Sequence, residues 1–170
     1  SAFAAMGRIA TDYYVQDGVI PRSKLAEVLG RIGELSREYG LKVGNVFHAG
    51  DGNLHASFLL DPRDELALAR ARRAGDEVLA MAIDMDGTIS GEHGVGVLKN
   101  GWLRRQWSPA AVAAHEAIKD ALDPRGLMNP GNIVGSPGVT EHLRYGAKYK
   151  TWEPKTLLDF SAQGGFAAAV

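Results

Sequence analysis

The chain has 170 residues, of which 45% are hydrophobic and 23% are charged, a balance that is typical of one folded domain and excludes a disordered chain. A formal net charge of −1 leaves no excess of Lys and Arg for binding nucleic-acid phosphates. Because there is no cysteine, any metal site must use histidine and carboxylate ligands, and no apolar run approaches the roughly 20 residues of a membrane span.

A strand and then a helix are predicted at the start of the chain. Residues 11–21 alternate between polar and apolar side chains and are rich in β-branched and aromatic residues, which indicates a strand. Residues 22–40 carry apolar side chains at helical spacing. Ser23 is the expected N-cap of this helix and Gly40 its expected end.

A hairpin and a long helix are predicted next. Residues 42–50 and 53–60 have strand character, and Asp51-Gly52 between them is typical of a two-residue hairpin loop. The helix is expected over residues 63–84. Its inner side is expected to carry Leu66, Ala69, Ala74, Val78, Met81 and Ala82.

The remaining pattern predicts the fold class. Residues 86–101 are glycine-rich without a helical period, and residues 108–122 form a further helix with Pro109 at its first position. Strand–helix–strand–strand–helix order favours an α+β fold, an antiparallel sheet with helices on one face. Residues 1–134 are therefore expected to form the domain, and residues 135–170, which lose any sustained period, an extended arm or linker.

Two histidines flank the predicted hairpin loop. With Asp51 and Gly52 as the loop residues, His48 would directly face His55, with Cβ atoms about 4.5–5.5 Å apart. Both imidazoles could then bind one divalent ion, and Ser57 would lie on the same face. The simpler alternative is a cross-strand aromatic pair, or one histidine bonded to a loop carbonyl. Two histidines in register across a glycine-rich turn favour the metal.

A third ligand is expected from the segment SGEHGVG, residues 90–96. Glu92 is the candidate ligand, and because adjacent side chains usually diverge, His93 could instead face a substrate as a general base. The alternative is a glycine-rich turn with two solvated polar residues. Two histidines and one acid with an open position are typical of a catalytic zinc site.

Three segments together resemble a known family. FHAGDGNLH (47–55), SGEHGVG (90–96) and DPRGLMNPGNIV (123–134) resemble, in this order and spacing, the C-terminal substrate-cap domain of FAD-linked oxidases of the glycolate oxidase large-subunit type. D-lactate and D-2-hydroxyglutarate dehydrogenases belong to the same group. The resemblance covers about residues 10–134 and implies a ferredoxin-like α+β core.

The resemblance implies a role for each candidate residue. His48, His55 and Glu92 would bind a divalent metal, expected to be zinc. His93 would act as the catalytic base, and Asn129 would lie near the flavin as a cofactor-binding residue.

Ser57 is where the chain departs from the pattern. Metal-binding dehydrogenases of the group often have Asn two residues after the second histidine. The contact made by that Asn is therefore not expected here, and the substrate preference can differ.

The resemblance also implies a reaction and its partners. A flavoprotein would oxidise glycolate or a D-2-hydroxy acid such as D-lactate to the 2-oxo acid, with FAD bound mainly by an upstream domain. Residues 135–170 resemble the connector to an iron–sulfur domain, so an iron–sulfur domain or subunit would receive the electrons.

The expected protein is accordingly a fragment that lacks the FAD-binding domain and is inactive alone. We expect a cytoplasmic location, which is compatible with peripheral association with the membrane through electron-transfer partners. Two other functions stay open from the residues alone, a metal-dependent hydrolase and a non-catalytic metal-binding interaction module.

Overall fold

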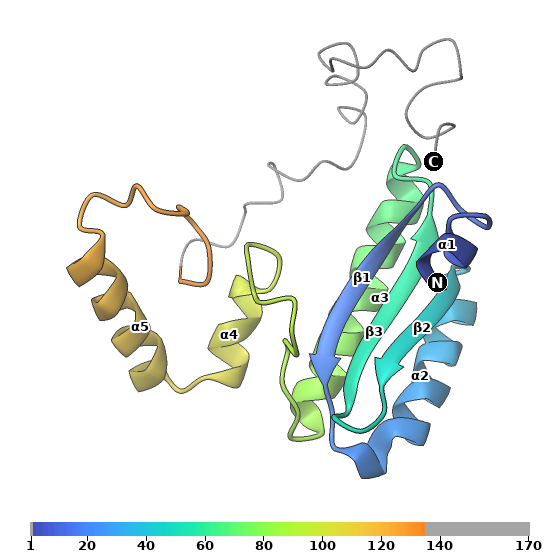
Figure 1. The fold of residues 1–170 in the computed structure, drawn as a ribbon, viewed down its shortest axis with the longest axis horizontal. Helices are drawn as coiled ribbons and strands as arrows, with labels where there is room; N and C mark the ends of the chain where they lie inside the picture. The colour runs from blue at the N-terminus through green and yellow to red at the C-terminus, as the bar shows by residue number, and fades with distance from the viewer. Residues whose placement is uncertain (1, 135–170) are drawn as a thin grey trace.

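The computed structural model describes residues 2–134, and its elements have α+β order (Figure 1). In chain order they are α1 (Ala2–Met6), β1 (Asp12–Val19), the 3-10 turn η1 (Arg22–Lys24), α2 (Leu25–Glu38), β2 (Lys42–His48), β3 (Asn53–Leu60), α3 (Glu65–Asp84), α4 (Asn100–Gln106) and α5 (Pro109–Leu122). No helix among the described residues is long and apolar enough to cross a membrane. The predicted arm, residues 135–170, lies outside the described residues.

The three strands form one antiparallel sheet in the order β1-β3-β2. Helices α2 and α3 both lie against the same face of this sheet (Figure 1). The predicted α+β fold, with an antiparallel sheet and helices on one face, is therefore confirmed.

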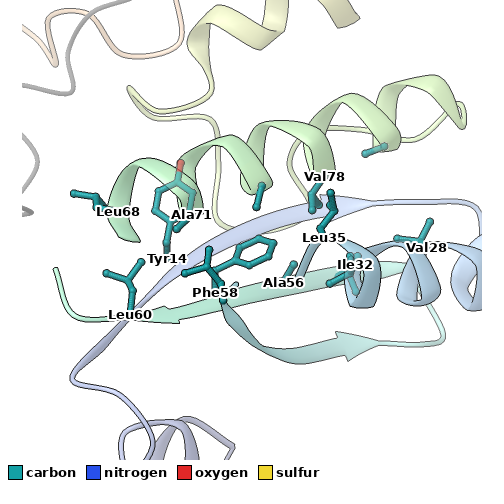
Figure 2. Close-up of a cluster of buried hydrophobic side chains, with 14 of the residues drawn as sticks. Tyr14, Val28, Ile32, Leu35, Ala56, Phe58, Leu60, Leu68, Ala71 and Val78 are labelled. Atoms are coloured by element: carbon teal, nitrogen blue, oxygen red, sulfur yellow. The ribbon is translucent and has the colours of Figure 1, made fainter. Parts of the chain in front are cut away.

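The hydrophobic core fills the space between this sheet and its two helices. Because side chains alternate along a strand, Ala56, Phe58 and Leu60 of β3 all point to the helical side (Figure 2). They meet apolar side chains of α2 and α3, among which Ile32 is fully buried. Burial of each large side chain of this kind stabilises the fold by about 1.5–3 kcal/mol. The opposite face of the sheet carries polar side chains such as Asp17, His55 and Ser57 beside apolar ones such as Leu59.

The order βαββα contains five of the six elements of a ferredoxin-like unit. At the point where a further strand would follow, the described chain makes only one bridge to the sheet. Val19 and Thr88 exchange two backbone hydrogen bonds, of 2.9 and 2.8 Å. The loop after Thr88 then turns over the face of the sheet that the helices leave open.

Two expectations about helix detail are wrong. Ser23 lies inside η1, and α2 begins without a side-chain cap. Leu66 and Ala69 are exposed, Leu66 by 67%. Of the other predicted inner residues, Ala74, Val78 and Ala82 are buried and Met81 is partly buried. The buried stripe of α3 also includes Ala67, Leu68, Ala71, Gly75 and Leu79. Most of this stripe packs on the sheet, where its small residues permit a close approach, while Leu79 packs against Ile89 and Leu103.

Gly75 illustrates that close approach. A Cβ atom at this position would lie only 2.7 Å from a ring carbon of Tyr14 and 2.9 Å from Gln16. The helix therefore turns this side toward β1. Hydrophobic periodicity alone did not predict that this side of α3 would face the sheet.

The helix ends were predicted with mixed success. Ser108 caps α5 by accepting a hydrogen bond from the Ala111 amide, with Pro109 at the first helical position as predicted. Gly40 follows α2 with a φ of 62°, as expected of a helix-ending glycine. The short helices α1 and α4 were missed, because one or two turns are too short to show a helical period.

Candidate metal centre

The hairpin that carries the two histidines has a different register from the one predicted. His48 pairs with Asn53, and His55 pairs with Val46. The connection is therefore four residues long, and the prediction that His48 directly faces His55 is wrong. The end of the hairpin loop also contacts the residue after β1, since the Ile20 amide donates a hydrogen bond to the Gly52 carbonyl at 3.0 Å.

The register differs by two residues, so both histidines still lie on one face. Side chains alternate with a period of two, and an even shift returns each to its own side. His48 and His55 are thus diagonal neighbours on the face opposite the helices. Their ring centroids are 5.6 Å apart and the rings are nearly perpendicular, at 88°.

Glu92 reaches this pair from the loop that follows Thr88. Its Oε1 lies 2.9 Å from His55 Nε2 and 3.6 Å from His48 Nε2. One donor atom from each of the three residues lies within 4.8 Å of the others. Two ligand atoms on a tetrahedral zinc are roughly 3.4 Å apart, since each bond is about 2.0–2.1 Å. The two distances from Glu92 bracket this value and the donor atoms of the two histidines lie within 4.8 Å, so a small closing movement would let all three side chains bind one divalent ion.

His93 lies closer to this cluster than the sequence suggested. Its ring stacks on that of His55, with centroids 4.7 Å apart and planes 16° from parallel. Its Nε2 is 3.6 Å from Glu92 Oε1, so the two adjacent side chains converge and do not diverge. Half of the His93 side chain is exposed, which leaves the imidazole accessible from solvent.

Beside the cluster lies a buried carboxylate that the sequence did not reveal. Asp17 is 1% exposed and pairs with His55 across β1 and β3. It accepts hydrogen bonds from the amides of Gly91 at 2.9 Å and His93 at 3.1 Å. The only local signal was an acid inside a strand pattern, which is equally typical of a solvated strand position.

Lys99 accompanies Asp17 in the interior. Its Nζ donates to the Asp17 backbone carbonyl at 2.5 Å and lies 3.6 Å from the carboxylate. Burial by itself raises the pKa of Asp17, but the hydrogen bonds from the loop amides and the charge of Lys99 outweigh it, so the pKa lies below its usual value. Burial lowers the pKa of Lys99, and Asp17 opposes this only in part.

Ser57 lies on the same face as the histidines, as predicted. It sits between Val15 of β1 and Gly44 of β2 and is fully buried. Its hydroxyl oxygen has no hydrogen-bond partner within the described residues. The Ser57 side chain therefore lies beside the cluster and is not one of its three candidate ligands.

Asn129 lies outside the cluster, in the turn after α5. It has a positive φ of 45° and lines a cavity of about 480 Å³. The glycine-rich segment from Gly94 to Gly96, α5 and the turn itself form the other walls. A hydrogen bond of 3.1 Å from the Ile133 amide to the Gly96 carbonyl ties the turn to this segment. The cavity thus begins one residue after His93.

Asp123 shapes that turn. It accepts hydrogen bonds from the amides of Leu127 at 3.0 Å and Met128 at 2.8 Å, and it pairs with Lys119 of α5. These three donors lower its pKa to about 2. The ionised carboxylate therefore holds the residues that precede Asn129.

Comparison with known proteins identifies similar sequences. Residues 1–133 match the family model described as FAD linked oxidases, C-terminal domain. The glycolate oxidase subunit GlcD of Escherichia coli (strain K12) is 42% identical over 149 residues, which cover 88% of this chain and 30% of that protein. The corresponding subunit of Bacillus subtilis (strain 168) is 35% identical over 133 residues, covering 78% of this chain and 28% of that protein.

A D-lactate dehydrogenase of Archaeoglobus fulgidus is 36% identical over 120 residues, which cover 71% of this chain and 26% of that protein. This chain therefore spans less than a third of the length of each of these relatives.

Proposed function

Because this chain belongs to the family of C-terminal domains of FAD-linked oxidases, we propose that it supplies the metal- and substrate-binding part of a dehydrogenase active site. The reaction would be the oxidation of glycolate or a D-2-hydroxy acid such as D-lactate to the 2-oxo acid. Relatives with both kinds of name match this chain, which supports a small 2-hydroxy acid as the substrate. Without the FAD-binding domain, the chain alone would be inactive.

The convergence of His48, His55 and Glu92 carries this proposal. Two imidazoles and one carboxylate are a donor set that suits zinc, and three protein ligands leave a position for a substrate oxygen. His48 and Glu92 are both about half exposed, so a small acid can approach them from solvent. His55 is buried, so the side chains packed around it hold its ring in place.

Each residue then has a chemical task. His48, His55 and Glu92 would hold a divalent ion, which would supply Lewis acidity to the substrate. FAD, held mainly by an upstream domain, supplies the acceptor for the C2 hydrogen and its two electrons. His93 takes the hydroxyl proton at its accessible imidazole. Asn129 borders the cavity that would face the flavin.

The proposal also includes where the domain ends along the chain. Residues 1–134 would form the substrate-cap domain. Residues 135–170 would form an arm or linker toward an iron–sulfur domain or subunit that receives the electrons. The loss of a sustained apolar period after residue 134 supports this division.

The same ligands could activate water in a hydrolase, or bind a metal in a non-catalytic module. Membership of an FAD-linked oxidase family favours oxidation over both, because neither alternative needs a flavin. The ligand set itself does not separate the three functions.

Metal analysis tests the first half of the proposal. The purified 170-residue chain should contain near-stoichiometric zinc, and His48→Ala should contain much less. His115→Ala is a matched control, because this histidine stacks on Trp107 away from the cluster and should leave the metal content unchanged. Equal metal in wild type and His48→Ala would contradict the site.

Flavin reduction tests the second half. The full-length flavin-containing protein should lose its flavin absorbance when mixed anaerobically with glycolate or D-lactate, and His48→Ala should not. A metal-loaded protein whose flavin no 2-hydroxy acid reduces would contradict the reaction while leaving the metal site intact.

A further inference from the structure

We propose that Asp17 is the positioning residue of the metal centre: its buried carboxylate holds both the loop that carries Glu92 and the ring of His55 in the orientation that an ion requires. This inference rests on the proposed metal site. It concerns a residue that touches neither ion nor substrate and acts through two ligands.

Asp17 is the anchor of the Glu92 loop. Its Oδ2 accepts from three successive amides, those of Gly91 at 2.9 Å, Glu92 at 3.3 Å and His93 at 3.1 Å. The Ser90 hydroxyl adds a fourth contact at 3.2 Å. Successive amides converging on one anion form the concave arrangement that proteins use to bind anions. Among the described residues these three amides have no backbone acceptor, so this carboxylate sets the backbone position of Glu92.

A steric contact fixes how closely the loop lies on the sheet. A Cβ atom at Gly91 would be only 2.3 Å from Asn53 Oδ1. Asn53 is itself buried in the first position of β3, beside His48. The absence of a side chain at Gly91 therefore lets the loop reach Asp17. The Asn53 side-chain amide limits how closely the loop can approach the sheet.

The second proposed ligand next to Asp17 is His55. Its Nε2 faces Glu92, while its Nδ1 is buried, has no hydrogen-bond partner among the described residues and lies 3.7 Å from Asp17 Oδ1. A histidine that binds a metal through one nitrogen usually donates its other N–H to a carboxylate or carbonyl. A shift of about 0.5–1 Å would bring this pair within hydrogen-bond distance. Asp17 would then fix Nδ1 as the protonated nitrogen and leave Nε2 for the ion.

The charge of Lys99 offsets part of the energetic cost of burying the Asp17 carboxylate. A carboxylate that is 1% exposed needs a compensating charge, because an unpaired buried charge is strongly destabilising. Lys99 is almost as buried, and it lies 3.6 Å from Asp17 Oδ2. Lys99 and the loop amides therefore share Oδ2, while Oδ1 faces His55.

The variant Asp17→Asn tests the proposal on the 170-residue chain, because it keeps the size of the side chain but removes its charge. Co²⁺ would be titrated against a competing chelator and followed by its visible absorption, which reports ligand geometry. We expect the affinity for Co²⁺ to fall 10–100-fold, the usual effect of losing such a partner, and the spectrum to change. Without metal, the amide protons of residues 91–93 should exchange faster than in wild type.

Asp64→Asn is the matched control. Asp64 also accepts a backbone amide, that of Ala67 at 2.9 Å, but at the start of α3. It should lose some thermal stability and keep the wild-type affinity and spectrum. A general loss of stability would affect both variants, whereas loss of positioning would affect Asp17→Asn alone.

The outcomes separate this inference from the metal site itself. If wild type and Asp17→Asn bind Co²⁺ with equal affinity and spectrum, the positioning role is wrong and the metal site stands. If wild type binds no Co²⁺, the metal site is wrong and the inference falls with it. If Asp17→Asn does not fold, nitrogen NMR of zinc-loaded wild type decides. A protonated Nδ1 on His55 is expected, with the downfield proton shift of a hydrogen bond to the Asp17 carboxylate; metal bound to Nδ1, or an Nδ1 proton without that shift, would overturn the proposal.

Discussion

Gly91→Ala should loosen the candidate metal centre through a single methyl group. The new Cβ atom would lie 2.3 Å from Asn53 Oδ1, whereas real Cβ contacts below 3.0 Å are essentially never seen. The loop or the amide must therefore move by about 0.7 Å or more, and the buried Asn53 has little room to move. Metal–ligand distances tolerate only about 0.2 Å, so a shift of this size at Glu92 weakens binding.

The stability change can be estimated in the same way. Overpacking of this kind costs about 1–3 kcal/mol. At this chain length 1 kcal/mol corresponds to about 2–4 °C, so the midpoint of thermal unfolding should fall by roughly 2–12 °C. A Co²⁺ titration of the same samples should show an affinity at least about tenfold lower, in line with the loss of a supporting contact.

Gly50→Ala provides the matched control for this measurement. Gly50 lies in the hairpin loop near His48, and an added Cβ atom would meet nothing within 4 Å. It should therefore keep the wild-type metal affinity and a similar or slightly higher stability. If Gly91→Ala matches Gly50→Ala in both stability and affinity, the packing of the loop against Asn53 is not as described.

Two further predictions follow from the site and its neighbouring turn. In the full-length flavin-containing protein, His93→Ala should keep its metal while flavin reduction by substrate slows roughly 10²–10⁴-fold, the usual loss of a general base, and the loss should shrink as pH rises. Loss of the metal from His93→Ala would instead make His93 a ligand. Lys119 and the turn amides lower the pKa of Asp123 to about 2 from 3.8, so the folded chain binds this proton more weakly than the unfolded chain. The stabilisation is complete above the ordinary pKa and disappears as pH falls from about 4 to 2. Urea unfolding across this range should show a smaller acid effect in Asp123→Asn, and an unchanged effect would contradict the role of this carboxylate.

The residues of the candidate centre could be named from the sequence because their signals are local. Alternation with a period of two places His48 and His55 on one face of a hairpin, and an error of two residues in register leaves that face unchanged. The glycine-rich segment around Glu92 was recognisable by composition alone. The fold class was equally accessible, since the order of strands and helices follows from local periodicity.

Only the tertiary structure decided how these local pieces meet. Asp17 lies 74 residues before Gly91, and an acid in a strand pattern looks the same whether it is solvated or holds a distant loop. The hairpin loop contacts another segment through Gly52 and Ile20, and the buried stripe of α3 lies where Gly75 fits against Tyr14. Each of these outcomes is set by packing between segments far apart in the chain. Periodicity within one segment carries no information about that packing.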